Sequence, residues 1–152
     1  MSYQITPTPQ LVLLNSDGSI TRQDLPVGDV ALRDDPETFY YYDFAVDGGG
    51  TGTIPLRGPA LAAGTFVNAA FIQVISAFTS DGSATVALTT GEAANDIQTA
   101  VAYNNAALAA GMHFPAVHKL TTVSRQPSIV IGAAALTGGK IKVLLDTMEG
   151  WG

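Results

Sequence analysis

The stretch Thr65–Thr90, TFVNAAFIQVISAFTSDGSATVALTT, contains two apolar runs separated by Asp81-Gly82. An Asp-Gly pair between such runs is a strong signal for a tight hairpin turn, in which both central residues need positive φ. Pairing the two arms about this turn predicts one dry face that contains Ile75 and Leu88. A two-stranded hairpin is not stable alone in water, so the pattern also predicts a partner sheet.

The opposite face of this predicted hairpin also carries large apolar residues, Ile72, Val74 and Phe78. If the first face forms the core, the second face is left over after core packing. An exposed apolar face of this kind is typical of a protein contact surface. We therefore expect Ile72, Val74 and Phe78 to contact another subunit or a larger assembly.

The segment Ser128–Met148, SIVIGAAALTGGKIKVLLDTM, predicts a second hairpin with its turn at Gly138-Gly139. Its dry face contains Val143 and Leu145, whereas its other face carries two lysines and an aspartate and is expected to be wet. Two hairpins with one dry face each most simply bury those faces against each other. Periodicity leaves open the alternative that the same segments lie in one sheet.

The remaining chain adds short β segments with turn signals at regular spacing. Asp17-Gly18 predicts a small hairpin, and residues 102–111 suit either a strand end or one or two helical turns. Further strands are expected at Leu11–Asn15, Ser19–Gln23, Thr38–Asp47, Thr53–Leu56, Ile97–Asn104 and Val117–Ser124. The pattern predicts an all-β antiparallel sandwich or a barrel.

Composition narrows the classes of function. The chain has 152 residues, no cysteine, 13 acidic and 7 basic residues, and a net charge of -6. The absence of cysteine excludes disulfides and thiolate metal sites, and the acidic balance disfavours binding to nucleic acid through phosphates. No run reaches the ~20 apolar residues of a membrane helix, so no membrane partner is expected. Only 13% of residues are charged, against roughly 25% in average domains, which favours a protein that buries surface in an assembly.

Candidate chemical motifs are weak. His113 and His118 have no further ligands at a recognisable spacing, so no metal site is predicted. The acidic cluster Asp34, Asp35 and Glu37 suits a calcium ion or paired carboxylates less well than a solvated loop. The glycine run at 48–52 is interpreted as a linker, because no lysine and helix follow it. No catalytic residue and no cofactor is therefore predicted.

Three consecutive tyrosines, Tyr40, Tyr41 and Tyr42, occupy the β-prone segment at 38–47. Stacking on sugars or bases would need them on one face. Strand alternation places Tyr41 opposite its two neighbours, so the triplet cannot form one flat platform. A strand with both faces covered is the favoured interpretation.

The segments FIQVISAFTSDGSATVALTTGEAANDIQTAVAY and VHKLTTVSRQPSIVIGAAALTGGKIKVLLDTM together resemble small virion proteins of tailed bacteriophages. Those proteins carry a strand, a Thr-Ser turn and a Ser-Ala-Thr-Val strand, and end in a hairpin with a hydrophobic–Ala-Leu-Thr-x-Gly-Lys pattern. The resemblance covers roughly residues 65 to 148 and is one of hairpins and turns. It implies a jelly-roll-like β-sandwich in a capsid decoration (cement) protein or a fibre protein.

The resemblance implies a non-enzymatic structural protein that is made in the bacterial host cytoplasm and located on the capsid surface. Its expected partners are further copies of itself, as a homotrimer, and the phage major capsid protein. One alternative is a fibre or receptor-binding module that recognises host glycans. A less favoured alternative is a glycan-active enzyme, which would need two inward carboxylates about 5 to 10 Å apart.

The N-terminal residues 1–10 contain Pro7 and Pro9 and are expected to form an extended arm. Residues 11–152 are expected to form a single sandwich domain, with the weakest patterns in 11–64. Tyr3 and Ile5 are apolar residues that free tails usually lack. We expect them, together with Leu11 and Leu13, to contact a neighbouring subunit or the capsid through an extended strand.

Overall fold

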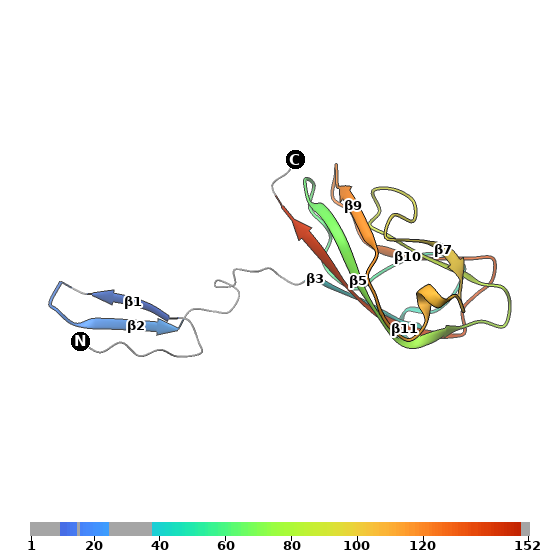
Figure 1. Cartoon of the computed structure of the whole chain (residues 1–152), viewed down its shortest axis with the longest axis horizontal. Coiled ribbons are helices and arrows are strands. Elements are labelled where there is room, and N and C mark those ends of the chain that lie inside the picture. The colour runs from blue at the N-terminus through green and yellow to red at the C-terminus, as the bar shows by residue number, and fades with distance from the viewer. Residues whose placement is uncertain (1–9, 15, 25–37, 150–152) are drawn as a thin grey trace. The chain divides into compact units, whose positions relative to one another are not determined.

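The computed structural model describes residues 10–14, 16–24 and 38–149 (Figure 1). The chain forms two compact units, Met1–Glu37 and Thr38–Gly152. This division differs from the predicted one, in which a single domain began at residue 11. Of the predicted arm at 1–10, only Gln10 lies within the described residues.

The first unit contains the antiparallel hairpin of β1 (Gln10–Leu14) and β2 (Ile20–Asp24), which confirms the hairpin predicted from Asp17-Gly18. The Asp17 carboxylate accepts a hydrogen bond from the Ser19 backbone N–H at 2.9 Å. Gly18 adopts φ of +86°, a conformation that suits glycine because it has no Cβ. The Asp-Gly pair therefore acts here as the sequence indicates.

The second unit is an antiparallel β-sandwich, as predicted (Figure 1). One sheet has the order β3-β11-β5-β8, with β9 also paired to β5, and the other has the order β4-β10-β6-β7. The first sheet consists of β3 (Thr38–Asp43), β11 (Gly138–Met148), β5 (Phe66–Thr79), β8 (Gly111–His113) and β9 (Ala116–Leu120). The second consists of β4 (Gly52–Pro55), β10 (Ser128–Gly132), β6 (Thr85–Thr89) and β7 (Gln98–Ala102). Short helical turns are α2 (Phe44–Asp47) and η1 (Ala106–Leu108).

Strand pairing in the sandwich is nested about the connection between β6 and β7. β6 pairs with β7, β5 with β8 and β9, β4 with β10, and β3 with β11. Two further ladders, β5 with β11 and β6 with β10, join these pairs into the two sheets. The chain therefore forms a series of nested strand pairs, like one long hairpin, whose strands are divided between the two sheets.

Both predicted long hairpins are wrong in their pairing. β5 and β6 lie in different sheets, and so do β10 and β11. The strands exchange partners instead, so that β5 pairs with β11 and β6 pairs with β10. The predicted turn at Asp81-Gly82 lies in a connection from one sheet to the other. Gly138-Gly139, the other predicted turn, begins β11, and residues 133–137 form the connection there.

The Asp81-Gly82 connection shows why no hairpin forms there. Neither residue is among the positive-φ residues of the described chain, so the turn geometry that the pair favours is not adopted. The Ser80 hydroxyl donates to the Ala135 carbonyl at 2.7 Å, and the Thr137 N–H donates to the Thr79 carbonyl at 2.7 Å. These bonds between the two connections replace those that a hairpin would have made within each.

The core lies between the two sheets. Leu88, Val143 and Leu145 are buried as predicted, but Ile75 is 48% exposed. Both faces of β5 carry apolar residues, so alternation alone did not show which face is inward. Ile75 also lies at an irregularity in the ladder, where Val74 pairs with Ile141 and Ser76 with Lys140.

The tyrosine triplet of β3 alternates as predicted, but the interpretation that both faces of the strand are covered is wrong for the face that carries Tyr41. Tyr40 and Tyr42 are fully buried in the core, whereas Tyr41 is on the outer side of the sheet and 39% exposed. The Tyr42 hydroxyl donates to the Gly48 carbonyl at 2.7 Å, and burial raises the pKa of Tyr42 to about 12. The buried Tyr42 hydroxyl thus has a partner in the glycine run that follows α2.

A carboxylate holds two loops together at the edge of the sandwich. Glu92 accepts hydrogen bonds from the Arg125 guanidinium at 2.8 Å, from the Thr122 N–H at 3.0 Å and from the Thr122 hydroxyl at 2.7 Å. These donors, Arg125 first, lower the pKa of Glu92 to about 2. The charged form of Glu92 is therefore favoured in the folded protein.

A pair of isoleucines on the same strand tests the observed face of β5. Ile72→Ala should lower the free energy of unfolding by about 2–5 kcal/mol, because Ile72 is fully buried. Ile75→Ala should lower it by less than about 1 kcal/mol, within the range of strand propensity. Urea unfolding of both variants measures the difference, and equal losses would contradict the register of the β5–β11 ladder.

Acid should weaken the Glu92 contacts. Because the folded-state pKa of Glu92 is about 2 and its ordinary value is 4.5, its contribution is complete above pH 4.5 and is lost as the pH falls toward 2. Glu92→Gln lacks this titration. Urea unfolding between pH 6 and pH 2 should show the stability difference between the wild type and Glu92→Gln shrinking as pH falls. A difference that stays constant over this range would exclude the assigned role.

Candidate functional site

A row of apolar side chains crosses the outer side of the five-stranded sheet. Leu144 of β11 pairs with Phe39 of β3 on one side and with Phe71 of β5 on the other. The ring of Phe114, which follows β8, packs edge-on against Phe71 with 5.5 Å between centroids. Because alternate residues of a strand lie on opposite faces, this row faces away from the core.

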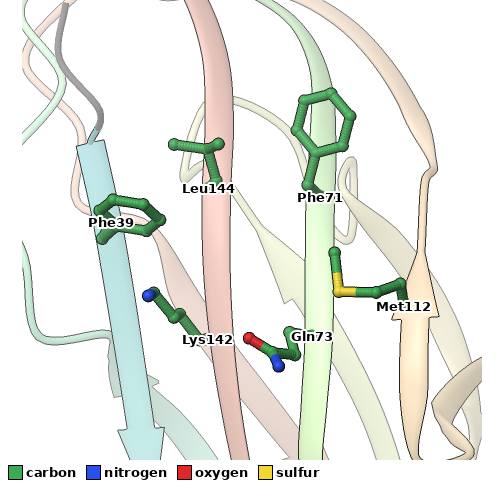
Figure 2. A pocket seen from close by; sticks show the side chains of 6 residues that line it. All are labelled: Phe39, Phe71, Gln73, Met112, Lys142 and Leu144. Atoms are coloured by element: carbon green, nitrogen blue, oxygen red, sulfur yellow. The ribbon is translucent and has the colours of Figure 1, made fainter.

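A second row lies beside the first and is partly polar. Lys142 of β11 pairs with Tyr41 and with Gln73, and Gln73 pairs with Met112 of β8. Figure 2 shows Lys142 and Gln73 on neighbouring strands, with apolar side chains around them. We call the two rows together the outer apolar face; its residues are Phe39, Tyr41, Phe71, Gln73, Met112, Phe114, Lys142 and Leu144.

The Lys142 ammonium lies over aromatic rings rather than beside a carboxylate. Its Nζ is 4.2 Å from the centroid of the Phe39 ring and 5.8 Å from that of Tyr41. Both distances are within the range of a cation–π interaction. The interaction keeps the positive charge of Lys142 at the centre of the outer apolar face.

Between the side chains is a hollow of about 110 Å³, lined by Phe39, Phe71, Gln73, Met112, Lys142 and Leu144 (Figure 2). Binding pockets for small organic molecules have volumes of roughly 300–1,000 Å³. The hollow is therefore too small to enclose such a ligand. Its size suits one or two side chains of a partner protein.

The exposure of this face is large for apolar residues. Phe114 is 65% exposed and Met112 is 49% exposed. Contiguous exposed apolar side chains with a polar rim are typical of interaction surfaces. The rim includes the ion pair of Lys140 with Asp43, at 3.5 Å, and the hydrogen bond from Asn68 to Asp146, at 3.0 Å.

The contact residues predicted from sequence are not those of this face. Ile72, Val74 and Phe78 are 0%, 2% and 3% exposed, so the prediction that they form a free surface is wrong. They face inward because the β5–β11 ladder places them opposite the other sheet. Tyr3 and Ile5 lie outside the described residues, and so do the side chains of Leu11 and Leu13.

The sequence contained part of the signal for the outer apolar face. Alternation separated Tyr41 from its neighbours and placed Lys142 on the outer side of β11. However, Phe39, Phe71 and Phe114 are far apart along the chain, and only the observed strand order makes them neighbours. From the sequence alone, these three phenylalanines could not be recognised as neighbours.

The structure also places the two histidines that were considered as metal ligands. In the described ranges, no group of three or more His, Cys, Asp or Glu residues is arranged to hold a metal ion. His113 makes a 2.7 Å hydrogen bond with the Ala109 carbonyl, and His118 is exposed. The acidic cluster Asp34, Asp35 and Glu37 lies outside the described residues. No helix among the residues with described positions has the length and apolar character needed to cross a membrane.

Comparisons of the chain with family models, curated proteins and solved structures found no match. The resemblance to phage virion proteins therefore stays a prediction based on the hairpin and turn residues. The outer apolar face is the feature of the described sandwich on which a functional proposal is best based.

Proposed function

We propose that the chain is a non-enzymatic structural protein of a tailed-phage virion, which binds the assembled capsid and stabilises it. The observation that carries this proposal is the outer apolar face. The core is already closed between the two sheets, so Phe114 and Met112 are not needed to complete it. Apolar residues that remain exposed beside a closed core support a role in protein contact.

The nested strand pairing supports the same class of protein. Eight-stranded double-sheet jelly rolls occur in viral capsid and lectin domains. A long hairpin rolled into two antiparallel sheets is consistent with the jelly-roll-like topology that the resemblance implies. Because one fold can serve many functions, the topology alone does not identify the role, and the outer apolar face is the main support for the proposal.

Three carboxylates of the described sandwich make structural contacts. Glu92 joins two loops, Asp96 accepts from the Thr90 N–H and hydroxyl at 2.6 Å each, and Asp47 pairs with Arg57 at 3.1 Å. A glycoside hydrolase would instead use two carboxylates across a cleft. These structural contacts favour the non-enzymatic role over a glycan-active enzyme.

A host-glycan-binding fibre module is the second candidate. The aromatic rings of Phe39 and Phe71 beside the polar groups of Gln73 and Lys142 resemble the combination that binds a sugar ring. However, most residues of the hollow are apolar, and a sugar needs several hydrogen bonds. Glycan-array binding by the purified protein would favour this candidate over the capsid.

Capsid binding tests the proposal directly. The protein should co-sediment with empty capsids of the phage that encodes it and should raise their melting temperature. Phe114→Ser should weaken this binding at least tenfold, because it removes the most exposed ring of the face. Val46→Ser is the matched control, since Val46 is 66% exposed on α2 and is not one of the residues of the outer apolar face. Equal binding by both variants would contradict a role for the face.

We also propose a homotrimer, supported by the low charge of the chain. The apolar surface first invoked for it, Ile72, Val74 and Phe78, is in the core, so composition is the remaining support. Light scattering of the isolated protein should give a mass near three chains. A monomer at micromolar concentration would remove the proposal of self-association and leave capsid binding to be judged by sedimentation.

A further inference from the structure

The centre of the outer apolar face holds a positive charge that has no anionic partner among the described residues. No carboxylate of the described residues lies within ion-pair distance of Lys142. Lys140, two residues earlier on the same strand and side, is paired with Asp43 at 3.5 Å. The two lysines therefore differ in whether the chain itself supplies a counter-charge.

Gln73 lies opposite Lys142 in the ladder and adds a second polar group at the same place. Within the described part of the chain, its amide makes no side-chain hydrogen bond. Lys142 and Gln73 both line the hollow, and the other four lining residues are apolar. The face therefore presents a cation and an amide inside an apolar surround (Figure 2).

This arrangement restricts what can cover the face. A partner that excludes water from Lys142 without pairing it would leave a buried charge uncompensated, which is strongly unfavourable. A carboxylate in the partner would remove that cost by forming an ion pair in a poorly hydrated environment. An amide beside the pair can donate a further hydrogen bond to the same carboxylate.

A second copy of the same face does not satisfy this requirement. An isologous contact centred on the hollow would bring two Lys142 ammonium groups together across the two-fold axis. Like charges placed together across an interface are unfavourable. The charge at the hollow thus favours a different surface as the occupant.

We propose that the outer apolar face binds a protein surface in which an aspartate or glutamate is flanked by apolar side chains. The carboxylate enters the hollow, pairs with Lys142 and accepts from Gln73. The flanking apolar groups pack on Phe71, Met112 and Phe114. This inference names the chemistry of the partner, and it rests on the proposed function where that partner is the capsid protein.

Two measurements on the full chain test the inference. The first is co-sedimentation with the phage's empty capsids, for the wild type and for Lys142→Met, Lys142→Glu and Lys142→Arg. Lys142→Met should weaken binding at least tenfold, Lys142→Glu should weaken it further, and Lys142→Arg should retain most of it. Lys140→Met is the matched control: Asp43 neutralises Lys140, which does not line the hollow, so its loss should weaken binding much less than the loss of Lys142. Melting curves establish that each variant is folded.

The second measurement needs no capsid. Anilinonaphthalene sulfonate combines aromatic rings with an anionic group, and N-phenylnaphthylamine is its neutral counterpart. The wild type should bind the anionic dye more tightly than the neutral one, and Lys142→Met should lose this preference while Lys140→Met keeps it. Loss of the dye preference in Lys142→Met would support the inference even if neither the wild type nor any variant bound capsids. The absence of capsid binding would overturn only the proposed function.

Three outcomes would overturn the inference. Capsid binding by the wild type that Lys142→Met and Lys142→Glu leave unchanged would show that the partner brings no carboxylate to this position. Equal affinity of the wild type for the two dyes would show that the outer apolar face does not select an anion. A wild-type dimer that Phe114→Ser dissociates would identify a second copy of the chain as the occupant.

Discussion

The ladder between β5 and β11 is the interaction on which the rest of the sandwich depends. It extends from the pair of Gly138 with Thr79 to the pair of Met148 with Phe66, in the middle of the five-stranded sheet. All other strands of that sheet are attached to one of these two. Because successive side chains alternate between faces, this single register assigns residues both to the core and to the outer apolar face.

The two sides of this ladder have different physical roles. On the inner side, Ile72 is opposite Val143, and both are fully buried against the second sheet. On the outer side, Phe71 is opposite Leu144, and these residues extend the apolar surface without closing a core. Burial on the inner side stabilises the fold, whereas the outer side leaves apolar area that only a partner can remove from water. Lys142 adds a requirement for charge to that surface.

The outer apolar face was partly predictable from the sequence. Alternation within β3 correctly separated Tyr41 from Tyr40 and Tyr42, and alternation within β11 correctly placed Lys142 on the outer side, because these properties depend only on the pleat of a strand. Alternation within β5 did not distinguish the inner face from the outer one, since both faces carry large apolar residues. Ile75 is on one face, and Ile72, Val74 and Phe78 are on the other. The gathering of Phe39, Phe71 and Phe114 depends on which strands are neighbours, and that is a property of the whole chain.

The sequence by itself determined the β character of the chain, most strand positions and the small hairpin at Asp17-Gly18, because these depend on local propensity and turn chemistry. Only the tertiary structure decided that the segment with Asp81-Gly82 and the segment 133–137 before Gly138 connect different sheets. The same Asp-Gly signal produced a hairpin in one place and a crossing in the other. The reason is that a turn residue permits a reversal, but hydrogen bonding with distant strands determines whether the reversal stays within one sheet. Thr79 and Ser80 bond to Thr137 and Ala135, more than fifty residues away, and no local pattern contains these partners.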